Sequence, residues 1–307
     1  MKKLMIALGA VAAAAVLFTA QAEENPVPEA PATSEAAEAE ELEEEESSLF
    51  EVSLTLEVNS AYVSHDRIWS DTPVAQYDVW MQMNLPEDFG WLAVDIWANQ
   101  ELNKNNSSRN ANGGKQLGGI GEFDYEIVYG NSIGPVDFTA SHLWYTYPRC
   151  GAHSQKFFTF GVAYNNDFLT PSAKLFWEYD CEGYSKQDCF MIDLAVSHDF
   201  ELTEDLTLTF TSKGTLFTEG YTKAITHDAD KPGEGLHRPA FGGWDNGLAL
   251  SYALTDNVTL GAHINYLYRL DHSVRHAAWD PYAYGSSDSS TSYAGILYGG
   301  VSVSLSF

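Results

Sequence analysis

Apolar and polar residues alternate along most of the chain from Phe50 onward, over runs of about ten residues. A period of two places successive side chains on opposite faces of a β-strand, whereas we find no convincing helical period. In the final run Val301, Val303, Leu305 and Phe307 alternate with serines. Twelve such runs predict strands near residues 50–64, 74–84, 90–100, 121–130, 135–147, 156–164, 172–179, 188–198, 205–217, 244–254, 257–269 and 293–307.

The connections between these runs alternate in length. The short ones are 85–89, 131–134, 165–171, 199–204 and 255–256. The long, polar ones are 101–120, 218–243 and 270–292, and they all fall among the odd-numbered connections. Short turns at one end and long loops at the other are typical of an outer-membrane barrel, with the turns in the periplasm. A soluble β-sandwich, which is the alternative, gives no reason for this segregation.

The predicted fold class is therefore all-β, a transmembrane antiparallel up-and-down β-barrel of about 12 strands and outer-membrane type. A sheet can span hydrocarbon only when it closes on itself, because every backbone N–H and C=O must be paired. An even strand number returns both termini to the periplasm. Aromatic residues near strand ends indicate interfacial girdles; these are Trp144, Tyr145, Tyr147, Trp177, Tyr179, Tyr266, Tyr268 and Phe307. We expect the protein in the bacterial outer membrane.

The N-terminal residues differ from this pattern. Residues 1–22 combine Lys2 and Lys3 with an apolar run and Ala20-Gln21-Ala22, which predicts a signal peptide. The apolar run is shorter than a membrane span requires. Residues 23–48 follow with eleven Glu and no basic residue, which predicts a disordered acidic tail in the periplasm. The barrel then occupies residues 49–307.

The acidic tail does not account for all of the charge. The whole chain carries a net charge of −27, and −18 of it belongs to residues 47–307. A nucleic-acid partner is disfavoured, since phosphate binding needs a basic surface. Strand parity places ten acids on the inward face: Glu51, Glu57, Asp78, Asp95, Asp124, Glu126, Asp137, Glu178, Asp193 and Asp245. The inward bases are Lys174, Lys213 and Arg269, and His263 can titrate there.

An acidic lumen predicts a porin-like channel for passive diffusion of small solutes that leans to cations. Three other interpretations stay open. The lumen can be filled by its own paired charges, as in small barrels. A non-conducting barrel can bind a ligand or partner through loops 218–243 and 270–292. A lipid-modifying enzyme would use histidines at the extracellular end, such as His65 and His142. None of these histidines sits in a recognisable nucleophile motif and no H-E-x-x-H motif occurs, so we expect neither an enzyme nor a metal or other cofactor.

The three cysteines are Cys150, Cys181 and Cys189. All lie in long loops or at strand ends, in an oxidising compartment where a pair should form. A Cys181–Cys189 disulfide would close a single loop and is our first choice. The alternative, Cys150–Cys181, would join neighbouring loops.

Several short motifs resemble the TorF-type porin family of bacterial outer-membrane β-barrels. They are Tyr62-Val63-Ser64, the segment Gly90–Gln100 (GWLAVDIWANQ), Glu122–Glu126 (EFDYE) and the strand ending Trp144–Pro148 (WYTYP). The resemblance covers roughly residues 51–200 and implies a porin-like barrel without catalytic residues. The chain departs from the family after Ser64, where His65–Ser70 replaces an aromatic-Arg-Gly segment.

Two kinds of partner are expected besides solutes. The lipid-facing surface requires outer-membrane lipid. The terminal strand ending at Phe307 looks like the C-terminal signal that is read by the barrel-assembly machinery.

Overall fold

The structure is a computed structural model. The chain divides into Met1–Ser48 and Leu49–Phe307. The structure describes residues 49–86, 89–102, 120–148, 154–179, 189–225, 238–271 and 294–307, all of which belong to the second unit.

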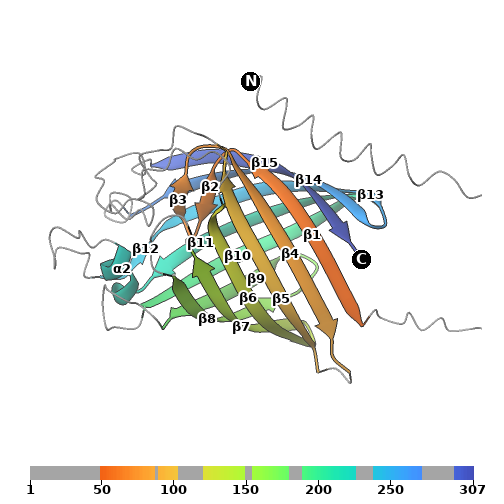
Figure 1. Ribbon diagram of the computed structural model, residues 1–307, viewed down its shortest axis with the longest axis horizontal. Helices are drawn as coiled ribbons and strands as arrows, with labels where there is room; N and C mark the ends of the chain where they lie inside the picture. The colour runs from red at the N-terminus through yellow and green to blue at the C-terminus, as the bar shows by residue number, and fades with distance from the viewer. Residues whose placement is uncertain are drawn as a thin grey trace, which may run out of the picture. The chain divides into compact units, whose positions relative to one another are not determined.

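Twelve antiparallel strands form one closed ring (Figure 1), which confirms the predicted fold class. Around the ring they are β1 (Phe50–Asn59), β4 (Val74–Asn84), β5 (Trp91–Glu101), β6 (Ile120–Ile133), β7 (Val136–Thr146), β8 (Gln155–Tyr164), β9 (Thr170–Glu178), β10 (Cys189–Thr203), β11 (Leu206–Phe217), β13 (Gly243–Thr255), β14 (Val258–Arg269) and β15 (Gly295–Ser306). A short strand, β12 (Ala240–Phe241), pairs with the end of β11.

The ring closes between its first and last strands. Leu54 of β1 pairs with Leu305 of β15, and the backbone amide and carbonyl groups of Val52 and Phe307 bond one another at 2.9 and 3.1 Å. On the opposite side, β10 pairs with β11 over Met191–Glu201. No sheet edge is left in the ring, so all twelve strands satisfy the pairing requirement of a hydrocarbon environment.

The two faces of the barrel wall differ as the alternation predicts. Large apolar side chains that are exposed on the outside sit at every second position, for example Ile127 and Tyr129 on β6. The residues between them, such as Asp124 and Glu126, point inward. An apolar outer band over a polar interior is the arrangement that a lipid-embedded barrel needs.

The girdle prediction requires aromatic side chains on the outer face. Trp144, Tyr179, Tyr266 and Tyr268 are exposed on the outer face near strand ends. It is wrong for Tyr145, which alternates with Trp144 and packs inside the barrel against Phe157. It is also wrong for Tyr147, which is buried with Tyr62 and Trp69. A cluster of aromatic residues on one strand cannot all face lipid, because side chains alternate.

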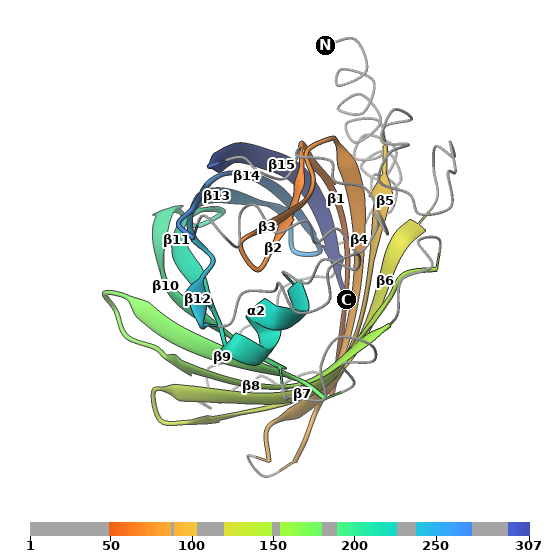
Figure 2. The same ribbon diagram turned by 90° about the vertical axis from the view of Figure 1, so that its left-hand side faces the viewer.

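Two elements lie inside the ring of strands (Figure 2). One is a hairpin made of β2 (Tyr62–Ser64) and β3 (Arg67–Ser70), and the other is the helix α2 (Glu219–Ile225). The predicted first strand, residues 50–64, is therefore too long, because β1 ends at Asn59. Ser60 caps the end of β1 through backbone contact with Gly299. In the described ranges, no helix is long and apolar enough to cross a membrane.

Candidate functional site

The turn between β2 and β3 reverses the chain inside the lumen. His65 and Asp66 both have positive φ, 46° and 57°. Two consecutive residues with this backbone conformation form the tight turn that matches the twist of a two-residue hairpin. Asp and His are both enriched in the left-handed region relative to other non-glycine residues, so the two residues suit this turn. Contacts with the barrel wall hold the tip in place.

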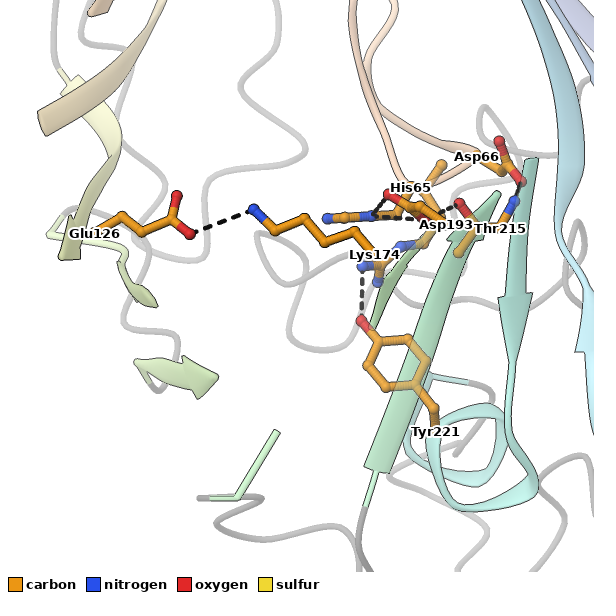
Figure 3. A network of polar contacts seen from close by, with 8 residues as sticks. His65, Asp66, Glu126, Lys174, Asp193, Thr215 and Tyr221 are labelled. Atoms are coloured by element: carbon orange, nitrogen blue, oxygen red, sulfur yellow. Dashed lines mark hydrogen bonds and ion pairs between the residues drawn. The ribbon is translucent and has the colours of Figure 1, made fainter. Parts of the chain in front are cut away.

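His65 is the first anchor of the hairpin tip. Its Nδ1 lies 3.1 Å from Oδ2 of Asp193 on β10, and its ring meets the edge of Phe176 on β9. The hydroxyl of Thr215 on β11 donates to the other oxygen of Asp193 at 2.7 Å. Figure 3 shows this group at the centre of a polar network. The sequence prediction placed Asp193 on the inward face but did not bring His65 to it.

Asp66 is the second anchor. The backbone N–H of Thr215 donates to Oδ2 of Asp66 at 2.6 Å, and the side chain is only 2% exposed. Burial raises the pKa of the Asp66 carboxyl to about 6, while the Thr215 hydrogen bond opposes that rise. Gly242 faces this carboxylate, and a Cβ there would come within 3.0 Å of the Asp66 Cβ. The glycine thus permits the close approach of the hairpin to the wall.

Arg67 connects the hairpin to α2. Its Nη2 donates to the hydroxyl of Tyr221 at 2.8 Å, and its guanidinium lies over the rings of Trp69 and Tyr221 at 4.6 and 5.5 Å. Tyr221 is 1% exposed and stacks on Phe217 of β11. Burial raises the pKa of the Tyr221 hydroxyl, so it remains a donor and acceptor of hydrogen bonds at neutral pH.

The base of the hairpin rests against the opposite wall. The ring of Tyr62 lies 5.5 Å from that of Trp97 on β5 and stacks with Trp69. The hydroxyl of Ser70 donates to the carboxylate of Glu101 at the end of β5. The hairpin therefore crosses the lumen from β5 to β10 and β11, held at both ends.

Two cavities flank the hairpin, and both include Val63 and Gln76 in their linings. One has a volume of about 340 Å³ and is lined by residues of β4–β7 and β9. We call it the acidic chamber, because Asp95, Asp124 and Glu126 face it. The second chamber, of about 310 Å³, is lined by residues of β1, β4, β11 and β13–β15.

The acidic chamber has an excess of carboxylates. Lys174 on β9 lies 3.3 Å from Glu126, and the hydroxyl of Ser141 also donates to that carboxylate. Asp95 is paired with Glu126 in the strand register. The carboxyl groups of Asp78 and Glu126 are close enough to Asp95 to interact with it electrostatically. Asp124 is 8% exposed. In the part of the chain that the structure describes, Oδ1 of Asp95 and of Asp124 is buried without a hydrogen-bond partner.

The other predicted pore-lining residues fall outside this chamber. Glu57 and His263 both line the second chamber, where Nδ1 of His263 lies 3.2 Å from Oε1 of Glu57. Lys213 pairs in register with Asp245 on β13. Glu178 accepts a hydrogen bond from Gln155 at the end of β9, and Arg269 is buried at the end of β14. The register therefore sets these side chains on the inner face with Asp78, but whether they line a conducting path stays a prediction.

Several lumenal residues were not singled out by sequence reasoning. Asp66, Arg67 and Tyr221 act through partners more than 140 residues away, and no local pattern reveals such pairs. Trp97 and Tyr145 could be placed inward by parity alone. Cys189, one half of the predicted Cys181–Cys189 disulfide, is buried at the start of β10. Cys181 and Cys150 lie outside the described residues, so both disulfide pairings stay predictions.

Three of the described histidines make polar contacts in different parts of the barrel. His65 contacts Asp193, His263 contacts Glu57, and His142 on the lipid face bonds the hydroxyl of Tyr179 at 2.6 Å. Within the ranges described, no group of three or more His, Cys, Asp or Glu residues is arranged to hold a metal ion.

Comparison with known proteins supports the fold. No protein-family model matches the chain, and no curated protein matches it. An outer-membrane channel of Pseudomonas putida F1 is similar in structure, with a TM-score of 0.50 and 7% identity over 84% of this chain and 95% of that one. The match to the NanC porin has a TM-score of 0.45 and 11% identity, and it covers 82% of this chain and 98% of the NanC chain. The match to an outer membrane phospholipase of Salmonella typhi has a TM-score of 0.42 and 12% identity, and it covers 82% of this chain and 90% of the phospholipase chain.

The closed ring of twelve strands, its apolar outer band and this likeness define the class of protein. The chain is a transmembrane β-barrel of the bacterial outer-membrane type.

Proposed function

We propose that this barrel is a porin-like channel for the passive diffusion of small solutes and that it leans to cations. The observation that carries the proposal is the acidic chamber beside the hairpin. Its lining holds three carboxylates, Asp95, Asp124 and Glu126, against one ammonium, Lys174. Carboxylates that line a narrow aqueous passage attract cations and repel anions.

The hairpin strengthens this effect by narrowing the lumen. It crosses from Tyr62 near β5 to His65 near β10, so solutes pass beside it and close to the charged wall. Charges act over about 8 Å at physiological salt, so their effect is strongest on solutes that pass close to the wall. A wide, unobstructed pore with the same charges would discriminate less.

The resemblance of the sequence to TorF-type porins supports the same conclusion. Its motifs include Glu122–Glu126, which supplies two acids of this wall, and Trp97 of the Gly90–Gln100 segment, which borders the chamber. We also propose that the terminal strand ending at Phe307 is the part of the chain that the barrel-assembly machinery recognises, because apolar residues alternate up to that terminal aromatic residue.

One observation favours a second function, a non-conducting barrel that binds a ligand or partner through its extracellular loops. The hairpin is tied to the wall at both ends, and α2 packs behind it through Arg67 and Tyr221. A lumen filled in this way can be closed.

Reversal potentials in planar lipid bilayers separate the two functions. Refolded protein in a KCl gradient should conduct, with a reversal potential of the sign that indicates cation preference. Absence of conductance in a correctly folded barrel would support the second function instead. An anion preference would contradict the proposed role of the acidic chamber.

A further inference from the structure

We propose that the acidic chamber is a binding site for a small organic cation, a primary ammonium group attached to an apolar or aromatic body. This inference names the class of solute for the channel and in that sense rests on the proposed function. It stands on four features of the chamber: buried carboxylate oxygens, uncompensated charge, aromatic rings and size.

The buried carboxylate oxygens require hydrogen-bond donors. Asp124 is more than nine-tenths buried, faces the chamber, and has no partner for Oδ1 among the described residues. Asp95 also faces the chamber and is partly buried, and its Oδ1 has no hydrogen-bond partner among the described residues. Leaving a buried charged acceptor without a hydrogen-bond donor is unfavourable. An ammonium group carries three donors and no acceptor, so it supplies what both carboxylates lack.

The charge of the chamber is not balanced from within. Lys174 contacts Glu126 at 3.3 Å, so that pair is neutral, whereas no basic side chain among the described residues forms an ion pair with Asp95 or Asp124. Asp95 on β5 pairs with Glu126, and Asp124 on β6 pairs with Trp97. The two acids therefore lie on neighbouring strands, and one cation between them would interact with both.

Aromatic rings complete the lining and distinguish an organic cation from a metal ion. Tyr62, Trp97, Tyr145 and Phe176 all border the chamber. The face of Phe176 already lies 5.1 Å from the ammonium of Lys174, so a cation can be accommodated over these rings. Cations are attracted to aromatic faces, and an apolar body gains from the same surface. The described acids, in contrast, do not converge in a metal-ligand cluster.

The size of the chamber sets the size of the ligand. Its volume of about 340 Å³ is at the lower end of the roughly 300–1,000 Å³ found for small-molecule sites. A single ring or short chain with one ammonium fits this volume, whereas a large polyamine or a peptide does not.

Titration calorimetry on the refolded full chain in detergent tests the inference. The probe is 2-phenylethylammonium, and the matched neutral compound is 2-phenylethanol. We expect the ammonium to bind and the alcohol to bind at least about tenfold more weakly, since loss of one charge-assisted hydrogen bond is worth at least that factor. Equal affinity for the two compounds, or binding of neither, would overturn the inference.

Three variants locate the site. Asp124→Asn and Asp95→Asn each preserve the shape of the side chain and should weaken binding of the ammonium by about tenfold or more. Asp199→Asn removes the same charge at an exposed position of β10 outside the chamber and should leave the affinity unchanged. Unchanged affinity in both chamber variants would overturn the inference.

Folding and conductance are measured on the same preparations. Heat-modifiable mobility on a gel confirms that each variant is a folded barrel, and a variant that fails to fold is replaced by the other chamber variant. Conductance without ammonium binding would overturn the inference and leave the channel in place. Binding without conductance would overturn the channel and leave the site in place.

Discussion

Nδ1 of His65 lies 3.1 Å from Oδ2 of Asp193, although the two residues are 128 positions apart in the chain. His65 is at the tip of the β2–β3 hairpin, and Asp193 is on β10, across the lumen from the strands at the base of that hairpin. Through this contact the connection between β1 and β4 crosses the interior of the barrel.

Removing the carboxylate of this contact should loosen the hairpin. We expect Asp193→Asn to weaken its docking by about 2 kcal/mol, the worth of a hydrogen bond to a charged group. Hydrogen exchange of peptides that cover residues 62–70 should accelerate, while exchange of β13 and β14 stays unchanged. The exposed Asp199→Asn on the same strand is the control, and equal exchange in the two variants would contradict this role of Asp193.

The buried carboxyl of Asp66 predicts a pH dependence of hairpin docking. Its pKa is about 6 when docked and 3.8 when exposed, so the docked state binds the proton more tightly. Docking is therefore strongest below about pH 4, weakens as the pH rises towards 6, and levels off above that, by a total on the order of 3 kcal/mol.

Asp66→Asn isolates this effect. The amide oxygen can still accept the Thr215 hydrogen bond, but the side chain no longer ionises. After correction for the intrinsic pH dependence of exchange, protection of residues 62–70 should fall from pH 4 to 7 by less in the variant than in the natural chain. Identical pH profiles would show that Asp66 does not control docking.

Tyr221→Phe should release α2 without altering the barrel. The substitution removes the hydroxyl that accepts from Arg67 at 2.8 Å but keeps the ring that stacks on Phe217. We expect a cost of about 1.5–3 kcal/mol, because the bond involves a charged donor in a buried position. We expect faster hydrogen exchange in Glu219–Ile225 and unchanged exchange in the strands. A uniform increase in exchange over the whole barrel would contradict this role of Tyr221.

A charge on the outer face should disturb membrane insertion. Ile127 lies in the middle of β6 and is 59% exposed on the lipid side. Ile127→Arg should destabilise the barrel in lipid vesicles by about 2–4 kcal/mol. Ser197→Arg places the same charge on the inward face of β10 and should cost much less. Similar denaturant midpoints for the two variants would contradict the assigned faces.

The barrel wall was predictable because the direction of each side chain depends only on its position along its own strand. Period-two alternation fixes which side chain faces lipid, so Asp95, Asp124 and Glu126 could be placed inward from the sequence alone. The expected closure of the ring follows from the membrane, which tolerates no unpaired edge. Strand ends were less certain, and β1 stops at Asn59 rather than at residue 64.

The interior was not predictable in the same way. Ser64–Arg67 contains two residues typical of turns, Ser64 and Asp66, but nothing in the segment indicates that it enters the lumen. Its position depends on Asp193, Thr215 and Tyr221, which lie in distant strands and in a helix inside a long connection. Such contacts appear only once the strands are arranged in space, and the two chambers appear with them.

Ion selectivity in planar bilayers tests the central claim most directly. The natural chain should conduct and prefer cations, and the double variant Asp95→Asn with Asp124→Asn should conduct with a clearly weaker cation preference. Asp199→Asn removes an acid of β10 outside the chamber and should weaken the cation preference less than the double variant does. A folded barrel that carries no current, or a cation preference that both substitutions leave unchanged, would contradict a channel governed by the acidic chamber.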